Sequence, residues 1–123
     1  MARVLIVDDL EFMRSLLRDI LRRQGHELAG EARNGREALL KYAQVKPDLV
    51  LLDITMPEMD GITALRRLRA ADPNAKVIMC SAISEHQLIL RASQLGARDY
   101  IVKPFREERV YSAIQRVLGL AVP

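Results

Sequence analysis

Five polar residues that could do chemistry directly follow short apolar runs of this chain. Asp8 and Asp9 follow the first run, and each of three later runs is followed by one of Asp53, Ser81 and Lys103. Two unit charges about 4 Å apart repel by about 4 kcal/mol at an effective dielectric constant near 20, so three clustered carboxylates need compensating positive charge. A divalent cation together with Lys103 would supply that charge.

The side chains available as ligands favour a hard cation. His26 and His86 lie in other contexts, where we expect them at the surface. Oxygen ligands without histidine or cysteine favour Mg2+, which keeps several of its waters when it binds to proteins. We therefore predict a Mg2+ site formed by Asp8, Asp9 and Asp53.

A Mg2+ site beside a lysine and a hydroxyl is typical of proteins that handle phosphoryl groups. The chain has neither a Gly-x-x-x-x-Gly-Lys loop nor a Gly-x-Gly-x-x-Gly motif, which disfavours a bound nucleotide. A carboxylate can instead accept a phosphoryl group itself. Asp53 is the predicted nucleophile, because the adjacent Asp8 and Asp9 are suited to hold the metal.

Each of these residues also has a structural explanation when it is taken alone. Asp9 could cap the helix that follows it, and Ser81 could cap the fourth helix. Asp53 could be a loop residue, and Lys103 could be a charge at the rim. Together these explanations fail, because they leave three neighbouring carboxylates without a counter-charge.

The elements that must position these residues alternate along the chain. Apolar runs of strand length occupy residues 4–7, 49–52, 77–80 and 100–102, and a weaker run at 27–32 suits an edge strand. Helical spacing indicates five helices, the second of which could be capped by Asn34. The apolar stripes predicted for the first and fourth helices are Phe12, Leu16, Leu17, Ile20 and Leu21, and Leu88, Ala92 and Leu95.

Five strands alternating with five helices predict an α/β fold with a doubly wound parallel sheet, because right-handed crossovers place helices on both faces. Ligands of such sheets gather at the carboxyl ends of the strands, near the point where the strand order reverses. The polar residues named above all fall at that edge. We expect a single domain over residues 1–123.

Composition excludes several other classes of protein. The chain is 50% hydrophobic and 28% charged, as in soluble globular domains, and it has neither a signal peptide nor an apolar run of membrane-spanning length. Cys80 is the only cysteine, so we expect no internal disulfide and a cytoplasmic location. The net charge is +3, but the basic residues are dispersed and only 4% of residues are aromatic, which disfavours nucleic-acid binding.

Four stretches resemble the receiver domain of two-component response regulators. They are Val7-Asp8-Asp9, the run from Leu52 to Gly61, Cys80-Ser81-Ala82, and the run from Gly96 to Phe105. Each stretch alone is a weak signal, but all four occur in order at strand ends. The resemblance covers nearly the full chain and implies a flavodoxin-like sheet with the strand order 2-1-3-4-5.

The resemblance also implies how the site works. Asp53 accepts a phosphoryl group from a partner histidine kinase, and the domain is a phosphoacceptor and not an enzyme that turns over substrate. Asp8 and Asp9 bind Mg2+ together with Asp53 and the backbone carbonyl of Thr55. Lys103 pairs with Asp53 and then with the phosphoryl oxygens, which matches the need of phosphoryl transfer for charge neutralisation.

A two-state switch follows from the same resemblance. The phosphoryl group accepts a hydrogen bond from Ser81 and draws it inward, and Tyr100 turns into the space that this movement leaves. The peptide bond between Lys103 and Pro104 is expected to be cis. Without the surrounding motif, Tyr100 would be interpreted as an ordinary aromatic residue of an edge strand.

We expect a downstream protein to bind the face formed by the fourth helix, the fifth strand and the fifth helix. Leu90 points away from the stripe of its helix, Tyr111 lies off the stripe of the next helix, and Tyr100 lies between them. If this sequence is the whole protein, the signal is expected to leave through contact with another protein, because little of the chain follows the fifth helix. We expect the chain to be a monomer.

Similarity along residues 8–14 and 53–61 points to chemotaxis regulators that bind the flagellar motor switch. A receiver cut from a longer transcription factor and a relay to a histidine phosphotransfer protein remain alternatives. An aspartate-nucleophile phosphatase of the haloacid-dehalogenase type is disfavoured, because such enzymes have a second Asp where this chain has Thr55. Flavin binding is disfavoured because no phosphate loop follows the first strand.

Two variable positions flank the phosphoryl group in similar proteins, and here they are Thr55 and Ile83. The apolar Ile83 offers no hydrogen bond to a hydrolytic water, so we predict slow loss of the phosphoryl group. Comparing the decay rate with that of Ile83→Glu tests this prediction, and equal rates would contradict it.

Overall fold

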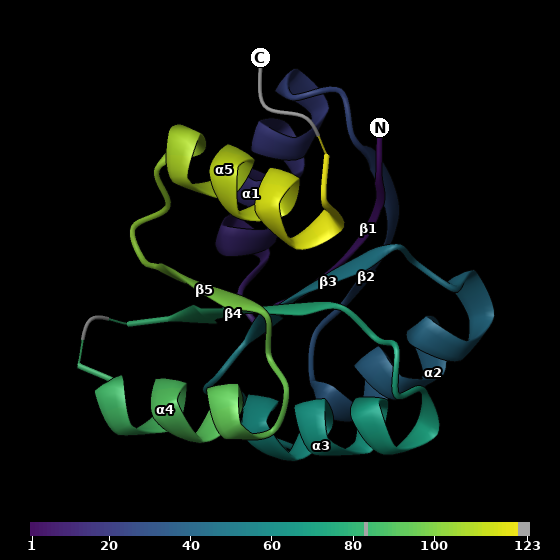
Figure 1. The fold of residues 1–123 in the computed structure, drawn as a ribbon, viewed down its shortest axis with the longest axis vertical. Helices are drawn as coiled ribbons and strands as arrows, with labels where there is room; N and C mark the ends of the chain where they lie inside the picture. Colours follow the sequence, from purple (N-terminus) through teal and green to yellow (C-terminus); the bar gives the residue numbers. More distant parts are fainter. Residues whose placement is uncertain (83, 121–123) are drawn as a thin grey trace.

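Strands and helices alternate along the chain in the computed structural model, which describes residues 1–82 and 84–120 (Figure 1). The strands are β1 (Arg3–Val7), β2 (Glu27–Ala32), β3 (Leu49–Asp53), β4 (Val77–Ser81) and β5 (Asp99–Val102). The helices are α1 (Glu11–Arg23), α2 (Gly35–Val45), α3 (Gly61–Ala71), α4 (His86–Gln94) and α5 (Glu107–Leu118). Every predicted element is present, and the ends differ from the predicted ones by a few residues, as helix and strand ends commonly do.

The strands form one parallel sheet in the order β2-β1-β3-β4-β5, which confirms the predicted topology. The strand order reverses between β1 and β3, where Val7 pairs with Leu52. On the other side of β3, Asp53 pairs with Cys80 of β4. The register therefore brings the residues at the carboxyl ends of three adjacent strands to one edge of the sheet.

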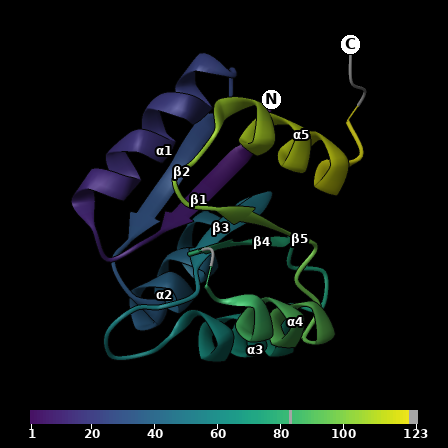
Figure 2. The ribbon, with the colours of Figure 1, turned by 90° about the vertical axis from the view of Figure 1, so that its left-hand side faces the viewer.

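Helices cover both faces of the sheet (Figure 2). α1 and α5 lie on one face, and α2, α3 and α4 lie on the other. Successive residues of β1 alternate between the two cores, with Val4 and Ile6 in one and Leu5 and Val7 in the other. All residues of β3 and β4 are buried, as expected for inner strands of a parallel sheet.

The residues that precede α1, α2 and α4 show which of the predicted helix caps are present. Asn34 caps α2 as predicted, because its Oδ1 accepts a hydrogen bond from a backbone N–H of the first turn at 2.9 Å. The capping explanations for Asp9 and Ser81 are wrong, since Leu10 precedes α1 and Glu85 precedes α4. Both residues are thus left for the site at the sheet edge.

Three residues of the predicted apolar stripes lie outside the core. The exposed fractions are 68% for Phe12, 37% for Leu16 and 40% for Leu88. In α1 the buried line runs through Arg14 and Leu17, and residues three and four apart share a face, so this line turns Phe12 and Leu16 outward. The predicted stripe is too wide, because the helix contacts the sheet along a narrower line than its apolar residues suggest.

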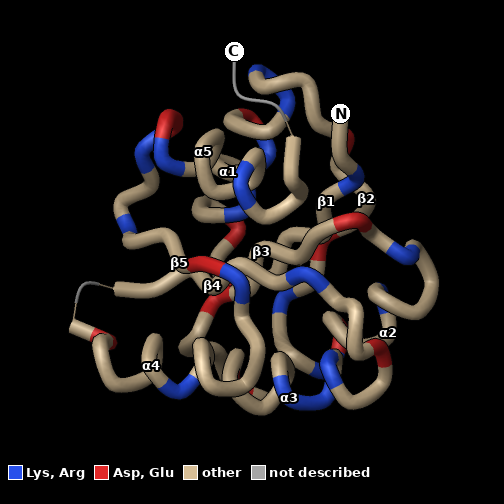
Figure 3. Tube along the Cα trace, viewed as in Figure 1, with Lys and Arg blue, Asp and Glu red and all other residues tan. Residues whose placement is uncertain are grey.

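Charged residues of both signs are distributed over helices, strands and loops (Figure 3). Several form pairs between elements, such as Arg23 with Glu107 and Arg109 with Asp99. In the part of the chain that the structure describes, no helix combines the length and the hydropathy needed to cross a membrane. Ile83, on which the prediction of slow phosphoryl loss rests, lies outside the described residues.

Candidate functional site

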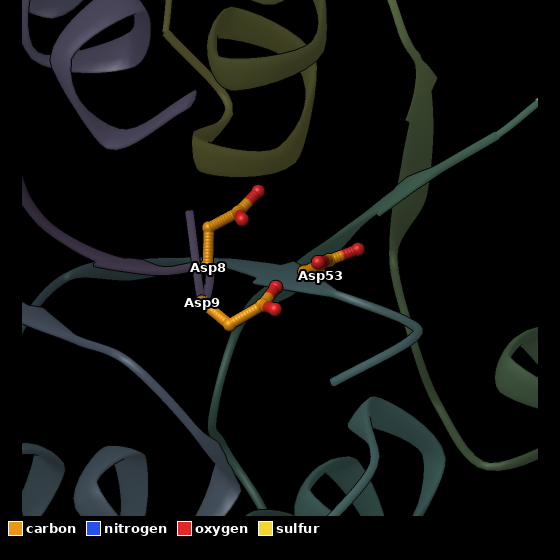
Figure 4. Close-up of side chains that lie close together, drawn as sticks. All are labelled: Asp8, Asp9 and Asp53. Atoms are coloured by element: carbon orange, nitrogen blue, oxygen red, sulfur yellow. The ribbon is translucent and has the colours of Figure 1, made fainter. Parts of the chain in front are cut away.

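Three carboxylates meet where β1 and β3 end (Figure 4). Asp8 and Asp9 follow β1, and Asp53 is the last residue of β3. One carboxylate oxygen from each residue lies within 4.8 Å of the other two. The pairing of Val7 with Leu52 explains this arrangement, because the next residues of the two strands emerge side by side. The structure thus brings together the three acidic residues of the predicted Mg2+ site.

Lys103 reaches the carboxylates from the end of β5. Its Nζ lies 3.1 Å from Asp8 Oδ2 and 3.3 Å from Asp53 Oδ1. Its backbone N–H donates to the carbonyl oxygen of Ser81 at 2.8 Å, which joins the ends of β4 and β5. The peptide bond from Lys103 to Pro104 is cis, as the resemblance implied. The resemblance implied the contact of Lys103 with Asp53 but not its contact with Asp8.

Burial and neighbouring charges shift the pKa values of Asp53 and Lys103 in this cluster. Asp53 is only 4% exposed, and burial together with the charge of Asp8 raises the pKa of Asp53 to about 6, although Lys103 acts against the rise. Burial also disfavours the ammonium of Lys103, but the carboxylates of Asp53 and Asp8 outweigh it and raise the pKa of Lys103. One ammonium beside three carboxylates leaves negative charge in excess.

Ser81 contributes a buried hydroxyl to the same edge. It is the last residue of β4 and follows Cys80, the strand partner of Asp53. Its Oγ has no hydrogen-bond partner among the residues that the structure describes. A buried hydroxyl without a hydrogen bond lowers the stability of the fold by about 1–3 kcal/mol. Such groups therefore commonly have a partner that is not part of the protein. The hydroxyl is free to donate to a group attached at Asp53.

Arg14 supports the acidic pair from α1, and sequence reasoning missed it. Its Nη1 donates to the backbone carbonyl of Asp8 at 2.7 Å, while Nη2 and Nε donate to Glu11 at 2.6 Å and Glu31 at 3.1 Å. The residue is buried, and its planar fork satisfies three acceptors at once. An arginine at a core position of an amphipathic helix is the signal that could have identified it.

Glu85 links the loops that follow β3 and β4, and it was also missed. Its Oε1 accepts a hydrogen bond from the backbone N–H of Ala82 at 2.6 Å, and its Oε2 accepts a short hydrogen bond from the hydroxyl of Thr55. Thr55 follows Asp53 by two positions in the chain. No spacing rule predicts this link, because it depends on the conformation of two loops.

Gly61 lets the segment after β3 fold back against the phosphoacceptor candidate. Its N–H donates to the carbonyl oxygen of Ile54 at 2.7 Å. A Cβ at this position would lie 2.1 Å from the carbonyl oxygen of Asp53 and 2.7 Å from the Cα of Ile54. Only glycine permits an approach this close.

Tyr100 of the predicted switch and the residues predicted for partner binding lie on another part of the surface than the carboxylates. Tyr100 is 43% exposed on β5, with the guanidinium carbon of Arg109 5.8 Å from the centre of its ring. The ring therefore points outward here, and not inward as implied for the switched state. Leu90 of α4 is exposed, as predicted. A surface hollow on this side is lined by His86, Ile89, Leu90, Tyr100 and Val102.

The residues present fit a bound Mg2+ ion. The donor set consists of carboxylate oxygens, which are hard ligands, and the excess negative charge matches a divalent cation. His26, expected at the surface, is instead half-buried, and its Nδ1 accepts a hydrogen bond from the backbone N–H of Ala2 at 3.1 Å. His86 is exposed at the start of α4, so neither histidine changes the donor set.

Comparisons with known proteins agree with this geometry. The family model of the response regulator receiver domain matches residues 4–115. The chain is 54% identical to the chemotaxis protein CheY of Thermotoga maritima, over 94% of this chain and 96% of the relative. It is 52% identical to the chemotaxis protein CheY of Bacillus subtilis, over 95% of this chain and 98% of the relative.

A solved structure shares the fold. A chain in the crystal structure of a CheX–CheY–BeF3–Mg2+ complex from Borrelia burgdorferi superimposes with a TM-score of 0.89 at 41% identity, and the match covers 94% of this chain and 87% of that chain. The flavodoxin-like sheet, the cluster of carboxylates and the match over most of the sequence lead to one conclusion. The chain belongs to the response regulator receiver domain family, whose members are signalling switches.

Proposed function

We propose that this chain is a phosphoacceptor switch in which Asp53 receives a phosphoryl group from a histidine kinase in a Mg2+-dependent reaction. The observation that carries the proposal is the buried carboxylate of Asp53 between Asp8, Asp9 and Lys103. Phosphoryl transfer requires positioning and neutralisation of charge more than covalent machinery. This arrangement of charges supplies both.

Asp53 acts as the nucleophile of the proposed reaction. One of its carboxylate oxygens bonds to phosphorus as the bond from phosphorus to the kinase histidine breaks, and the electron pair leaves with the imidazole. Lys103 then pairs with the phosphoryl oxygens, and the buried hydroxyl of Ser81 donates to one of them. The two residues neutralise and fix the new group.

Asp8 and Asp9 would hold the metal, together with Asp53 and the backbone carbonyl of Thr55. When bound, Mg2+ supplies positive charge to the phosphoryl oxygens. Arg14 fixes the backbone of Asp8 from behind and thereby orients the acidic pair. The protein contributes an ordered set of oxygen ligands before the donor arrives.

Phosphorylation changes partner binding at the face formed by α4, β5 and α5 in this proposal. Ser81 moves toward the phosphoryl group, and Tyr100, now exposed beside Leu90, turns inward. High identity to chemotaxis proteins over nearly their whole length supports a downstream target in flagellar motor control. The chain would act in the cytoplasm as a monomeric receiver domain of residues 1–123.

Intact-mass spectrometry after incubation with acetyl phosphate tests the phosphoacceptor function. The wild-type protein should gain one phosphoryl group in Mg2+ and none in EDTA, and Asp53→Asn should gain none. The Asp19→Asn variant, which changes an exposed aspartate of α1, is the matched control and should be labelled like the wild type. An adduct on Asp53→Asn would contradict the assignment.

Binding to the purified motor-switch protein of the same organism tests the chemotaxis assignment. The affinity should rise when Mg2+ and beryllofluoride, a phosphoryl mimic, are added. Equal affinity with and without the mimic would contradict a motor-control role. Onward transfer of the phosphoryl group to a histidine phosphotransfer protein would indicate a relay in its place.

A further inference from the structure

We propose that Glu85 restrains the site before phosphorylation, by occupying two hydrogen-bond donors at its edge and by adding negative charge there. The proposal rests on the phosphoacceptor function of Asp53. It makes Glu85 a positioning residue, since its contacts are with Thr55 and Ala82 and not with the reacting atoms.

The two donors lie beside the phosphoacceptor because of the sheet register. Asp53 pairs with Cys80, and the backbone N–H of Ile54 donates to the carbonyl oxygen of Cys80 at 3.0 Å. The chain segments that leave β3 and β4 therefore remain side by side for one residue beyond the paired positions. Thr55 and Ala82 are the next residues along these two segments.

Glu85 occupies both donors at once. Its two carboxylate oxygens accept from the backbone N–H of Ala82 and from the hydroxyl of Thr55. Its own backbone is fixed by α4, because the N–H of Ile89 donates to the carbonyl oxygen of Glu85 at 3.0 Å. The side chain thus ties the start of α4 to the loop that follows the phosphoacceptor.

The carboxylate of Glu85 adds negative charge to the loop that follows Asp53, near a cluster that already carries excess negative charge. Three carboxylates lie around the ammonium of Lys103, and Glu85 holds a further carboxylate against the hydroxyl of Thr55, two residues after Asp53 in the chain. A phosphoryl donor carries about two negative charges and is repelled by this field. Loss of the charge of Glu85 should therefore speed the arrival of the donor.

The same tie connects the site to the face proposed for partner binding. A phosphoryl group on Asp53 is a strong acceptor that can compete for the donors held by Glu85, and its charge has the same sign as the carboxylate of Glu85. When Glu85 releases Thr55 and Ala82, the start of α4 loses its link to the loop after β3. α4 begins at His86, the residue after Glu85, and His86 lines the surface hollow. Release of Glu85 therefore changes the constraints on one end of the face proposed for partner binding.

The rate of labelling by acetyl phosphate in saturating Mg2+ tests the proposal. Glu85→Gln keeps the size of the side chain without its charge, and we expect it to be labelled about threefold or more faster than the wild type at low salt, with the difference fading at high salt. Glu108→Gln removes an exposed glutamate of α5 and is the matched control, expected to behave like the wild type. Thr55→Val removes the hydroxyl, and combining it with Glu85→Ala should give less than the product of the two single effects.

The amide resonance of Ala82 gives a readout that is independent of labelling. Its N–H donates to a carboxylate, so its proton resonance should move upfield in Glu85→Ala. Equal labelling rates for the wild type and Glu85→Gln at low salt, or an unmoved Ala82 resonance in Glu85→Ala, would overturn the restraint. Absence of any wild-type adduct would contradict the phosphoacceptor function itself, and with it the restraint.

Discussion

Asp53 combines two requirements that conflict. It must be ionised to act as a nucleophile, yet burial and the charge of Asp8 raise its pKa to about 6. Near neutral pH without a metal ion, the folded protein therefore holds an unfavourable charge. A cation among the carboxylates removes the conflict, so the cost of the charge before binding and the affinity for the ion have the same origin.

Asp53→Asn should stabilise the metal-free protein. The pKa of Asp53 rises from 3.8 to about 6 on folding, so stability is lost as the pH increases through this interval and is not recovered above it. A pKa rise of this size corresponds to about 3 kcal/mol, and after a discount for solvent screening we expect the free energy of unfolding to increase by about 1–2 kcal/mol. Urea unfolding of both proteins in EDTA at about pH 8 measures this difference in the free energy of unfolding.

The pH dependence of that gain is its internal control. At about pH 5 the folded wild type already carries a proton on Asp53. The gain in stability from Asp53→Asn should therefore be about half as large as at about pH 8. Asp19→Asn should change stability little at either pH, because Asp19 is exposed on α1. If Asp53→Asn proved less stable than the wild type at the higher pH, the unfavourable charge would be contradicted.

Protons and Mg2+ should compete at Asp53. Below a pKa of about 6 the carboxylate is mostly protonated and cannot serve as an anionic ligand. The apparent affinity for Mg2+ should therefore fall about tenfold between about pH 7.5 and about pH 5. Titration calorimetry at the two pH values measures this, and an unchanged affinity would show that Asp53 is not a ligand.

At the scale of elements, the loop after β3 depends on the absence of a side chain at Gly61. Gly61→Ala would place a methyl group against the carbonyl oxygen of Asp53, so we expect a loss of about 1–3 kcal/mol in stability and weaker Mg2+ binding. Gly30→Ala on β2 is the matched control, since its Cβ would have its nearest neighbour at 3.5 Å. Urea unfolding of both variants measures the difference, and equal losses would contradict the close approach.

α1 acts on the site through Arg14. Arg14→Lys keeps the charge but loses the fork that bonds Asp8, Glu11 and Glu31 together, so Mg2+ binding should weaken several-fold. Arg18→Lys is the matched control, because Arg18 pairs with the same two glutamates from the next turn of the helix. Calorimetry with Mg2+ distinguishes them. Equal affinities in the two variants would show that Arg14 does not position the acidic pair.

The sequence predicted the elements well because apolar runs and helical spacing are local properties. It predicted the carboxylates for a related reason, since polar residues at the ends of parallel strands converge once the sheet forms. It placed Phe12 and Leu16 wrongly because apolar character alone does not show which line of a helix meets the sheet. Glu85 escaped prediction because its contacts depend on the conformation of two loops.

The whole molecule assembles its site from four distant parts of the chain. Asp8, Asp53, Ser81 and Lys103 come from the ends of four adjacent strands, so the site exists only in the folded sheet. The same strands carry the helices that flank the site on either face. In the proposed switch, a change of charge at this edge reaches α4 and β5 without crossing the core.

The position of the phosphoryl group tests the central claim most directly. Borohydride reduces an aspartyl phosphate to homoserine, which peptide mass spectrometry then locates in the chain. After labelling with acetyl phosphate, homoserine should be found at residue 53 in Mg2+ and nowhere in EDTA. Homoserine at residue 8 or 9, or labelling of residue 53 that persists in EDTA, would contradict a Mg2+-dependent phosphoacceptor at Asp53.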